Sequence, residues 1–307
     1  MGLEGIGMAV FGKRKVTPAI EVAPEPSAPK VEPMNMSVVP PQATAVVAEP
    51  VQAYVFTRST RLPSLVRVLS RAREIRPEIP MLELVDNGDG SSLMVRSDRT
   101  DTAAASMFLA TQFPLQELQP MMEQCRDWQT RASDLKGHRS HAIVSATHSD
   151  PAIAHLILTG LTAAMIEETN ASGVYWANSG NLMGTGAFLL RALEERRDQV
   201  MTLWANVETL STTYRPGCVL AKTVGLGAFG LPEYECVCTQ DELAEKMFDF
   251  MFGLAIGAMK TREQREDGSF QDLGTGGSGR SYELTFHHLP STRDGKTPVV
   301  RVEIYRG

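Results

Sequence analysis

The period of hydrophobic and polar positions changes along the chain, and these changes predict its secondary structure. Residues 53–57 and 103–112 are short, mainly apolar runs of the kind that form strands. Residues 62–75 repeat Leu, Val and Ile at the three- and four-residue spacing of an amphipathic helix. The tight-turn sequence NGDG separates two apolar runs and predicts a hairpin over residues 81–96. A further helix is predicted over residues 115–132.

The second half of the chain mixes strand and helix patterns in the same way. A helix is predicted directly after Asp150, which can cap it while Pro151 takes the first helical position. The other predicted elements are strands over residues 141–147, 173–176, 200–210 and 218–224, helices over 187–197 and 240–259, and a closing hairpin of 281–288 with 299–305. This mixture predicts an α+β fold with mixed, mainly antiparallel sheets packed against helices.

The N-terminal residues follow neither period. Residues 16–50 mix Pro, Ala, Val and Glu irregularly, which predicts a disordered Pro-rich arm over residues 1–50. Two α+β subdomains are predicted after it, at residues 51–136 and 137–307. The arm is a candidate for docking a protein partner, and a plain tether is the alternative.

Charge and composition narrow the classes of partner. The chain of 307 residues has 36 acidic and 30 basic residues and a net charge of -6, whereas nucleic-acid binders usually present a basic face. No apolar stretch is long enough to span a bilayer and the N-terminus carries no export signal, so we expect no membrane contact and a cytoplasmic location. Four cysteines without a disulfide spacing fit reduced thiols. The oligomeric state stays open.

Two glycine-rich stretches resemble nucleotide-binding motifs. GTGGSGRS, residues 274–281, has the spacing of a P-loop, but Arg280 stands in place of lysine, polar residues precede it and a strand pattern follows. GLGAFG, residues 225–230, has the spacing of a dinucleotide-binding turn, but Pro232 falls within the helix that should follow. We interpret both stretches as turns and expect no cofactor.

Histidines are the other candidates for chemistry. His138, His141, His148 and His155 lie close together in the sequence. The predicted strand places His141 and His148 on opposite faces, and the predicted helix places His155 on its flank, so no metal site is expected. The acidic turn DNGDG is not expected to bind calcium, because its glycines stand where a calcium-binding loop needs oxygen ligands. No nucleophile motif is present, and no catalytic residue is predicted.

The candidate binding surface is GVYWANSGN, residues 173–181. Strand alternation sends its two aromatic side chains to opposite faces, and the polar residues after them supply short donors and acceptors. The candidate site residues, for a ligand or a protein partner, are Tyr175, Trp176, Asn178, Ser179, Asn181 and His141. The alternative is an ordinary turn next to a packed tryptophan. Proximity of His141 or Glu235 to this stretch would favour an enzyme.

Three short motifs, GHRSHAIVS, GVYWANSGNLM and FGLPEYE, resemble in their order those of the bacterial family called domain of unknown function 4261. The resemblance covers residues 137–305, is weaker over 51–136 and is absent before them. It implies a bacterial protein with the α+β fold of that family, and it supplies no catalytic residues. We therefore expect a non-catalytic binding or interaction module in the bacterial cytosol. The alternative is a hydrolase or ligand-processing enzyme with its site near residues 173–181.

Overall fold

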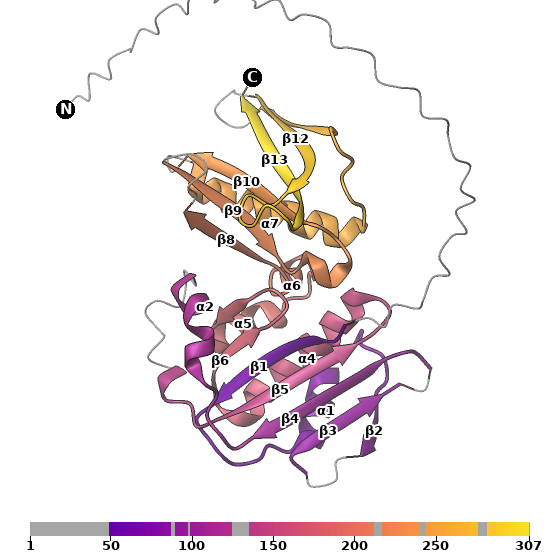
Figure 1. Cartoon of the computed structure of the whole chain (residues 1–307). Coiled ribbons are helices and arrows are strands. Elements are labelled where there is room, and N and C mark those ends of the chain that lie inside the picture. The colour runs from indigo at the N-terminus through magenta and orange to yellow at the C-terminus, as the bar shows by residue number, and fades with distance from the viewer. Residues whose placement is uncertain are drawn as a thin grey trace, which may run out of the picture. The chain divides into compact units, whose positions relative to one another are not determined.

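The computed structural model describes residues 49–86, 90–97, 99–124, 135–211, 217–239, 243–275 and 281–306. The predicted arm, apart from Glu49 and Pro50, lies outside the described residues, as do the tip of the NGDG turn and most of GTGGSGRS. Val47–Gly307 form one compact unit with two sheets and several helices (Figure 1). All but one of the strand pairings are antiparallel, which confirms the predicted α+β class.

The first sheet, sheet A, contains strands from both predicted subdomains. Its order is β2-β3-β4-β5-β1-β6-β7, and all its neighbours are antiparallel. Its strands are β1 (Val51–Thr57), β2 (Glu83–Asp86), β3 (Ser92–Arg96), β4 (Ala103–Leu109), β5 (Ser140–Thr147), β6 (Ala171–Trp176) and β7 (Asn181–Met183). Because β1 lies between β5 and β6, the predicted boundary at residues 136 and 137 does not divide this sheet.

Helices α1 (Leu65–Ile75) and α4 (Pro151–Thr169) pack on one face of sheet A (Figure 1). The predicted cap of α4 is confirmed, because the Asp150 side chain accepts a hydrogen bond from the Ala152 N–H at 2.8 Å. A Cβ atom on Gly160 would lie 3.1 Å from the Ala72 carbonyl oxygen, so glycine allows α4 to approach α1 closely.

The opposite face of sheet A, the outer face, is covered over part of its width. The short helices η1 (Leu115–Leu118) and α2 (Gln119–Gln124) follow β4. Leu118 and Leu135 form a small buried cluster with Phe56 of β1 and Leu182 of β7. This cluster shields the outer face over β1, β6 and β7.

The second sheet, sheet B, has the order β11-β12-β13-β10-β9-β8. Its strands are β8 (Asn206–Ser211), β9 (Cys218–Val224), β10 (Glu233–Thr239), β11 (Phe270–Thr275), β12 (Ser281–Pro290) and β13 (Pro298–Arg306), with β10 and β13 parallel. The long helix α7 (Leu243–Thr261) packs on β8, β9 and β10. Met247 and Met251 of α7 are buried in the same core as Cys236 and Val302 of the sheet.

Two short helices, α5 (Thr185–Ala192) and α6 (Arg197–Met201), connect the two sheets along the chain. The short helix η2 (Leu226–Phe229) lies between β9 and β10 of sheet B and contacts α4. Trp204, which follows α6, and Phe229 of η2 belong to one hydrophobic core with residues of both sheets. The Trp204 Nε1–H donates a 3.1 Å hydrogen bond to the Thr159 hydroxyl on α4. The two sheets are therefore joined by one core rather than by a linker.

Some predicted elements differ from the structure. The strand predicted over residues 200–210 is wrong in its first half, because α6 ends at Met201 and β8 begins only at Asn206. Met201, Leu203 and Trp204 form an apolar run because all three are buried in the core, and a run of this kind fits a strand equally well. Strand β7 was missed, and so was β11, in which Gly274 and Thr275 lie.

Candidate functional site

The predicted stretch 173–181 builds the β6–β7 hairpin and part of the core. Trp176 is fully buried, with its ring 6.1 Å from that of His155 and 5.9 Å from that of Phe188. The side-chain oxygen of Asn178 accepts a 2.8 Å hydrogen bond from the Gln52 N–H of β1. This bond satisfies a backbone donor at the point where the β1–β6 ladder ends.

The other residues of the stretch have similar roles. The buried Ser179 hydroxyl donates a 3.5 Å hydrogen bond to the Leu203 carbonyl oxygen, and Asn181 pairs with Trp176 across the hairpin. Tyr175 is half-buried on the outer face, with its ring centre 5.9 Å from that of Tyr54. The structure thus places the candidate side chains in a hairpin that they help to hold together.

His141 lies on β5, two strands away from β6. Its Nδ1 shares a 2.9 Å hydrogen bond with the Thr111 carbonyl oxygen, its ring contacts Phe113, and burial lowers its pKa. Among the described residues, the hydrogen bonds and ring contacts of Trp176, Asn178 and Asn181 involve neither His141 nor Glu235. The structure therefore does not gather these titratable groups around residues 173–181.

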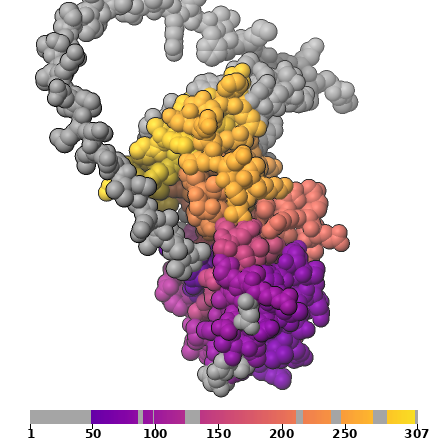
Figure 2. Space-filling view, turned by 90° about the vertical axis from the view of Figure 1, so that its right-hand side faces the viewer, coloured from indigo at the N-terminus to yellow at the C-terminus, as the bar shows by residue number. Residues whose placement is uncertain are grey.

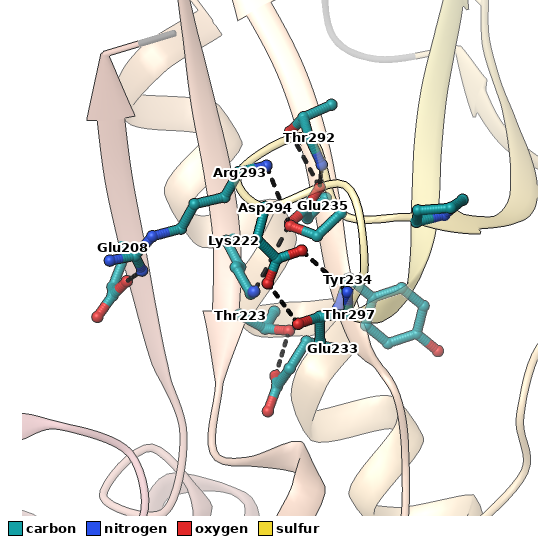
Figure 3. A network of polar contacts seen from close by, with 12 residues as sticks. Glu208, Lys222, Thr223, Glu233, Tyr234, Glu235, Thr292, Arg293, Asp294 and Thr297 are labelled. Carbon is teal, nitrogen blue, oxygen red and sulfur yellow. Dashed lines mark hydrogen bonds and ion pairs between the residues drawn. The ribbon is translucent and has the colours of Figure 1, made fainter.

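Glu235 belongs to a different polar network, on the face of sheet B away from α7 (Figure 3). This fully buried carboxylate accepts a short hydrogen bond from the Ser291 hydroxyl and bonds of 3.0 and 3.1 Å from the Thr292 N–H and hydroxyl. Lys222 Nζ of β9 lies 3.6 Å from Glu235 Oε1. This network holds the β12–β13 turn against β10. Because Ser291 is only 1% exposed, its hydroxyl is inaccessible to a substrate.

Further contacts hold the tip of the β12–β13 turn. Arg293 Nη1 lies 3.8 Å from Glu208 Oε2 on β8. Asp294 Oδ1 accepts hydrogen bonds of 2.8 and 2.9 Å from the N–H groups of Lys296 and Thr297. Together with the bond from the Thr297 hydroxyl, these bonds hold the pKa of Asp294 well below its usual range.

The glycine turn GLGAFG is closed by Glu233, the acidic residue of the G-L-P-E motif. Glu233 Oε1 accepts hydrogen bonds from the N–H groups of Gly225 and Gly227 at 2.9 and 3.2 Å, and Oε2 accepts a 2.7 Å bond from the Thr223 hydroxyl. Burial raises the pKa of Glu233, and these hydrogen bonds oppose the shift. A carboxylate of the chain thus occupies the N–H groups that a glycine-rich turn would offer to a phosphate.

His155 lies fully buried among the rings of Trp176, Trp204 and Phe229. Its Nδ1 shares a 2.7 Å hydrogen bond with the Pro151 carbonyl oxygen, whereas its Nε2 has no partner among the described residues. The prediction that His155 lies on a helix flank was wrong, because α4 is buried on almost every side. No group of three His, Cys, Asp or Glu within the described ranges is arranged to hold a metal ion.

A groove of about 760 Å³ lies beside α7. One face of this helix forms its floor, with the residues Phe250, Gly253, Leu254, Gly257, Ala258 and Thr261. A Cβ atom added to Gly253 or Gly257 would meet no atom within 4 Å, so both glycines border open space. In Figure 2, residues from this part of the chain, coloured orange, reach the surface.

The rim of the groove is polar. Tyr234 of β10 is 3% exposed, and burial raises the pKa of its phenol, while nearby Arg265 opposes this shift. Arg265 donates a 3.0 Å hydrogen bond to Gln271 and lies 5.4 Å above the centre of the Phe286 ring. The lining contains no histidine or cysteine. This arrangement can bind apolar groups and hydrogen-bond a ligand.

Sequence reasoning missed this groove. The available signal was helix α7 itself, since its segment from Met247 to Met259 is apolar on more than one face. One face of α7 packs on sheet B through Met251 and Ala255. A second apolar face of the same helix indicates that another part of the chain or a partner covers it.

The comparisons add no relative. No protein-family model matches the chain, and no curated protein or solved structure matches it either. Within the described ranges, no helix has the length and apolarity needed to cross a membrane.

Proposed function

We propose that the protein is a non-catalytic interaction module that binds an apolar segment of a partner protein in the groove beside α7. The observation that carries this proposal is the floor of the groove, where Phe250 and Leu254 flank the open space over Gly253 and Gly257. An apolar side chain placed there would leave water at the usual gain of about 25 cal/mol per Å² of buried area. The polar rim supplies both donors and acceptors, as recognition of a peptide backbone requires.

Charge narrows the chemistry of the partner segment. The groove is lined by two acidic residues, Glu263 and Glu266, and by one basic residue, Arg265. The Arg265 guanidinium is engaged with Gln271 and with the Phe286 ring, whereas both glutamates are exposed. We therefore propose that the bound segment carries Lys or Arg beside its apolar residues.

The second candidate, a hydrolase or ligand-processing enzyme near residues 173–181, has less support. Trp176 and Ser179 are buried there, and Asn178 is bonded to β1. The proposal of an interaction module also includes a bacterial origin and membership of the family of domain of unknown function 4261, which rest on the short motifs alone. It includes a cytosolic location, which rests on the cysteine and hydrophobicity patterns of the sequence.

Selection from a displayed library of random peptides tests the proposal. We expect the selected peptides to combine large apolar residues with Lys or Arg and to bind the purified protein. Gly257→Leu should weaken that binding at least about tenfold, because the new leucine side chain fills the groove. The fold should tolerate this change, because leucine is a better helix former than glycine.

Gly186→Leu is the matched control, because Gly186 is another helical glycine bordered by open space, on α5. Its peptide affinity should stay that of the unmodified protein. Selected peptides that are acidic, or that bind the Gly257→Leu variant unchanged, would contradict the proposal.

A further inference from the structure

Tyr234 is a buried polar residue in the lining of the groove beside α7. Strand alternation places it on the opposite face of β10 from Glu235, and its ring points away from the polar network around that carboxylate (Figure 3). The Tyr234 N–H bonds to the Thr223 hydroxyl, whereas the phenol hydroxyl has no hydrogen-bond partner among the described residues. The fully enclosed side-chain atoms without a partner do not include this hydroxyl, so it is open to the groove.

The other polar side chains of the groove are either bonded within the chain or solvated. The Ser269 hydroxyl donates a 2.6 Å hydrogen bond to a backbone carbonyl oxygen, and Gln271 accepts the bond from Arg265. The exposed side chains, which water can satisfy, are those of Thr261, Glu263, Gln264 and Glu266. Within the described part of the chain, Tyr234 is therefore the buried polar side chain of this lining that still needs a hydrogen-bond partner.

We infer that the Tyr234 hydroxyl donates a hydrogen bond to a backbone carbonyl of the segment bound in the groove and thereby fixes the position of that segment. This inference rests on the proposed function. A segment that fills the groove displaces water from the hydroxyl, which is costly unless the segment supplies an acceptor in its place. Aliphatic side chains have no acceptor, and Lys and Arg only donate, so the backbone carbonyls are the acceptors of a segment that is apolar and basic.

This contact also determines the backbone conformation of the bound segment. Inside a helix, each carbonyl already accepts a bond from the N–H group four residues further on, whereas an extended segment leaves its carbonyls free. The floor of the groove follows α7 from Phe250 to Thr261, a length of roughly 16 Å. About five extended residues span this length. We therefore expect the segment to be extended where it passes Tyr234.

The affinity of the full chain for the peptides selected for the groove tests the inference. Tyr234→Phe removes only the hydroxyl and should weaken binding roughly three- to tenfold. Its thermal unfolding should match that of the unmodified protein, because the hydroxyl has no partner among the described residues. Tyr175→Phe is the matched control, since Tyr175 is a half-buried tyrosine of sheet A outside the groove, and it should leave the affinity unchanged.

Peptides in which single backbone amides are replaced by esters locate the contact, because an ester carbonyl is a weaker acceptor than an amide carbonyl. We expect one ester position to lower the affinity for the unmodified protein several-fold and to have little effect with Tyr234→Phe. Peptides that are blocked by Gly257→Leu but bind Tyr234→Phe unchanged would overturn this inference and leave the proposed function standing. Ester effects that are equal in both proteins at every position would also overturn it. Failure to select any groove-binding peptide would overturn both proposals.

Discussion

At the scale of single residues, His155 shows how burial rather than residue type decides chemistry. Its ring is enclosed by Trp176, Trp204 and Phe229, and the pKa falls from the ordinary value of 6.5 to about 4, mainly because burial disfavours the charged form. Arg262 acts in the same direction, whereas the hydrogen bond to Pro151 opposes it. His155 is therefore a neutral core residue near pH 7.

This lowered pKa predicts a loss of stability in mild acid. As the pH falls, the His155 ring takes up a proton in the unfolded chain before it does so in the folded chain. The stability that depends on neutral His155 is therefore complete above about pH 6.5 and is lost progressively towards pH 4. The loss should approach about 3 kcal/mol. Urea unfolding of the unmodified protein and of His155→Phe across this range measures it.

The His155→Phe variant retains an aromatic ring but cannot titrate, so its free energy of unfolding should fall less over the same pH range. The lowered pKa of His141 contributes a slope of the same sign to both proteins and cancels in the comparison. Parallel stability curves would show that His155 is not responsible.

At the scale of elements, the turn between β9 and β10 shows why particular glycines are required. Gly225 has a φ of 116°, and a Cβ atom there would lie 2.4 Å from the Trp204 carbonyl oxygen. Gly227 has no atom within 4 Å of an added Cβ. The two glycines of one motif therefore differ in their structural requirement.

Gly225→Ala should lower the free energy of unfolding by at least about 3 kcal/mol, because it adds a backbone clash to an unfavourable φ. Gly227→Ala should change it by no more than about 0.5 kcal/mol. Thermal and urea unfolding of both variants provide the comparison. Similar losses in the two variants would mean that the turn tolerates a side chain at Gly225.

At the scale of the whole molecule, the order of the strands ties the two halves of the sequence together. The unit β1-α1-β2-β3-β4 recurs as β10-α7-β11-β12-β13, with the first and last strands parallel in each case. In sheet B these two strands pair directly, whereas in sheet A β5 lies between them. Strand β5 belongs to the second predicted subdomain, residues 137–307, so sheet A needs both predicted subdomains.

We therefore expect the fragment of residues 137–307 not to fold alone, because β5 and β6 both pair with the missing β1. It should lack the near-ultraviolet circular dichroism of the buried Trp176 and Trp204. The chain from residue 49 onwards is the control and should keep that signal. Cooperative unfolding of the fragment by itself would show that residues 137–307 are an independent domain.

The candidate site could be predicted only in part. Alternation along the strand correctly placed Trp176 and Tyr175 on opposite faces, and the turn chemistry of Asn178 was visible in the sequence. That Asn178 would bond to Gln52 could not be predicted, because this contact depends on β1 pairing with a distant part of the chain. The groove was also missed: all of its lining except Tyr234 of β10 comes from residues 250–271, and the path of this stretch past Tyr234 depends on how α7 packs on sheet B.

The sequence by itself determined the features that depend on local physics. These include the α+β class, the capped start of α4 at Asp150, and the glycine turn before Pro232, because periodicity, capping and backbone freedom act over a few residues. The tertiary structure decided the position of β1 between β5 and β6, the burial of Glu235 beneath the β12–β13 turn, and the groove beside α7. Each of these depends on which distant surfaces exclude water together, and local pattern does not specify that choice.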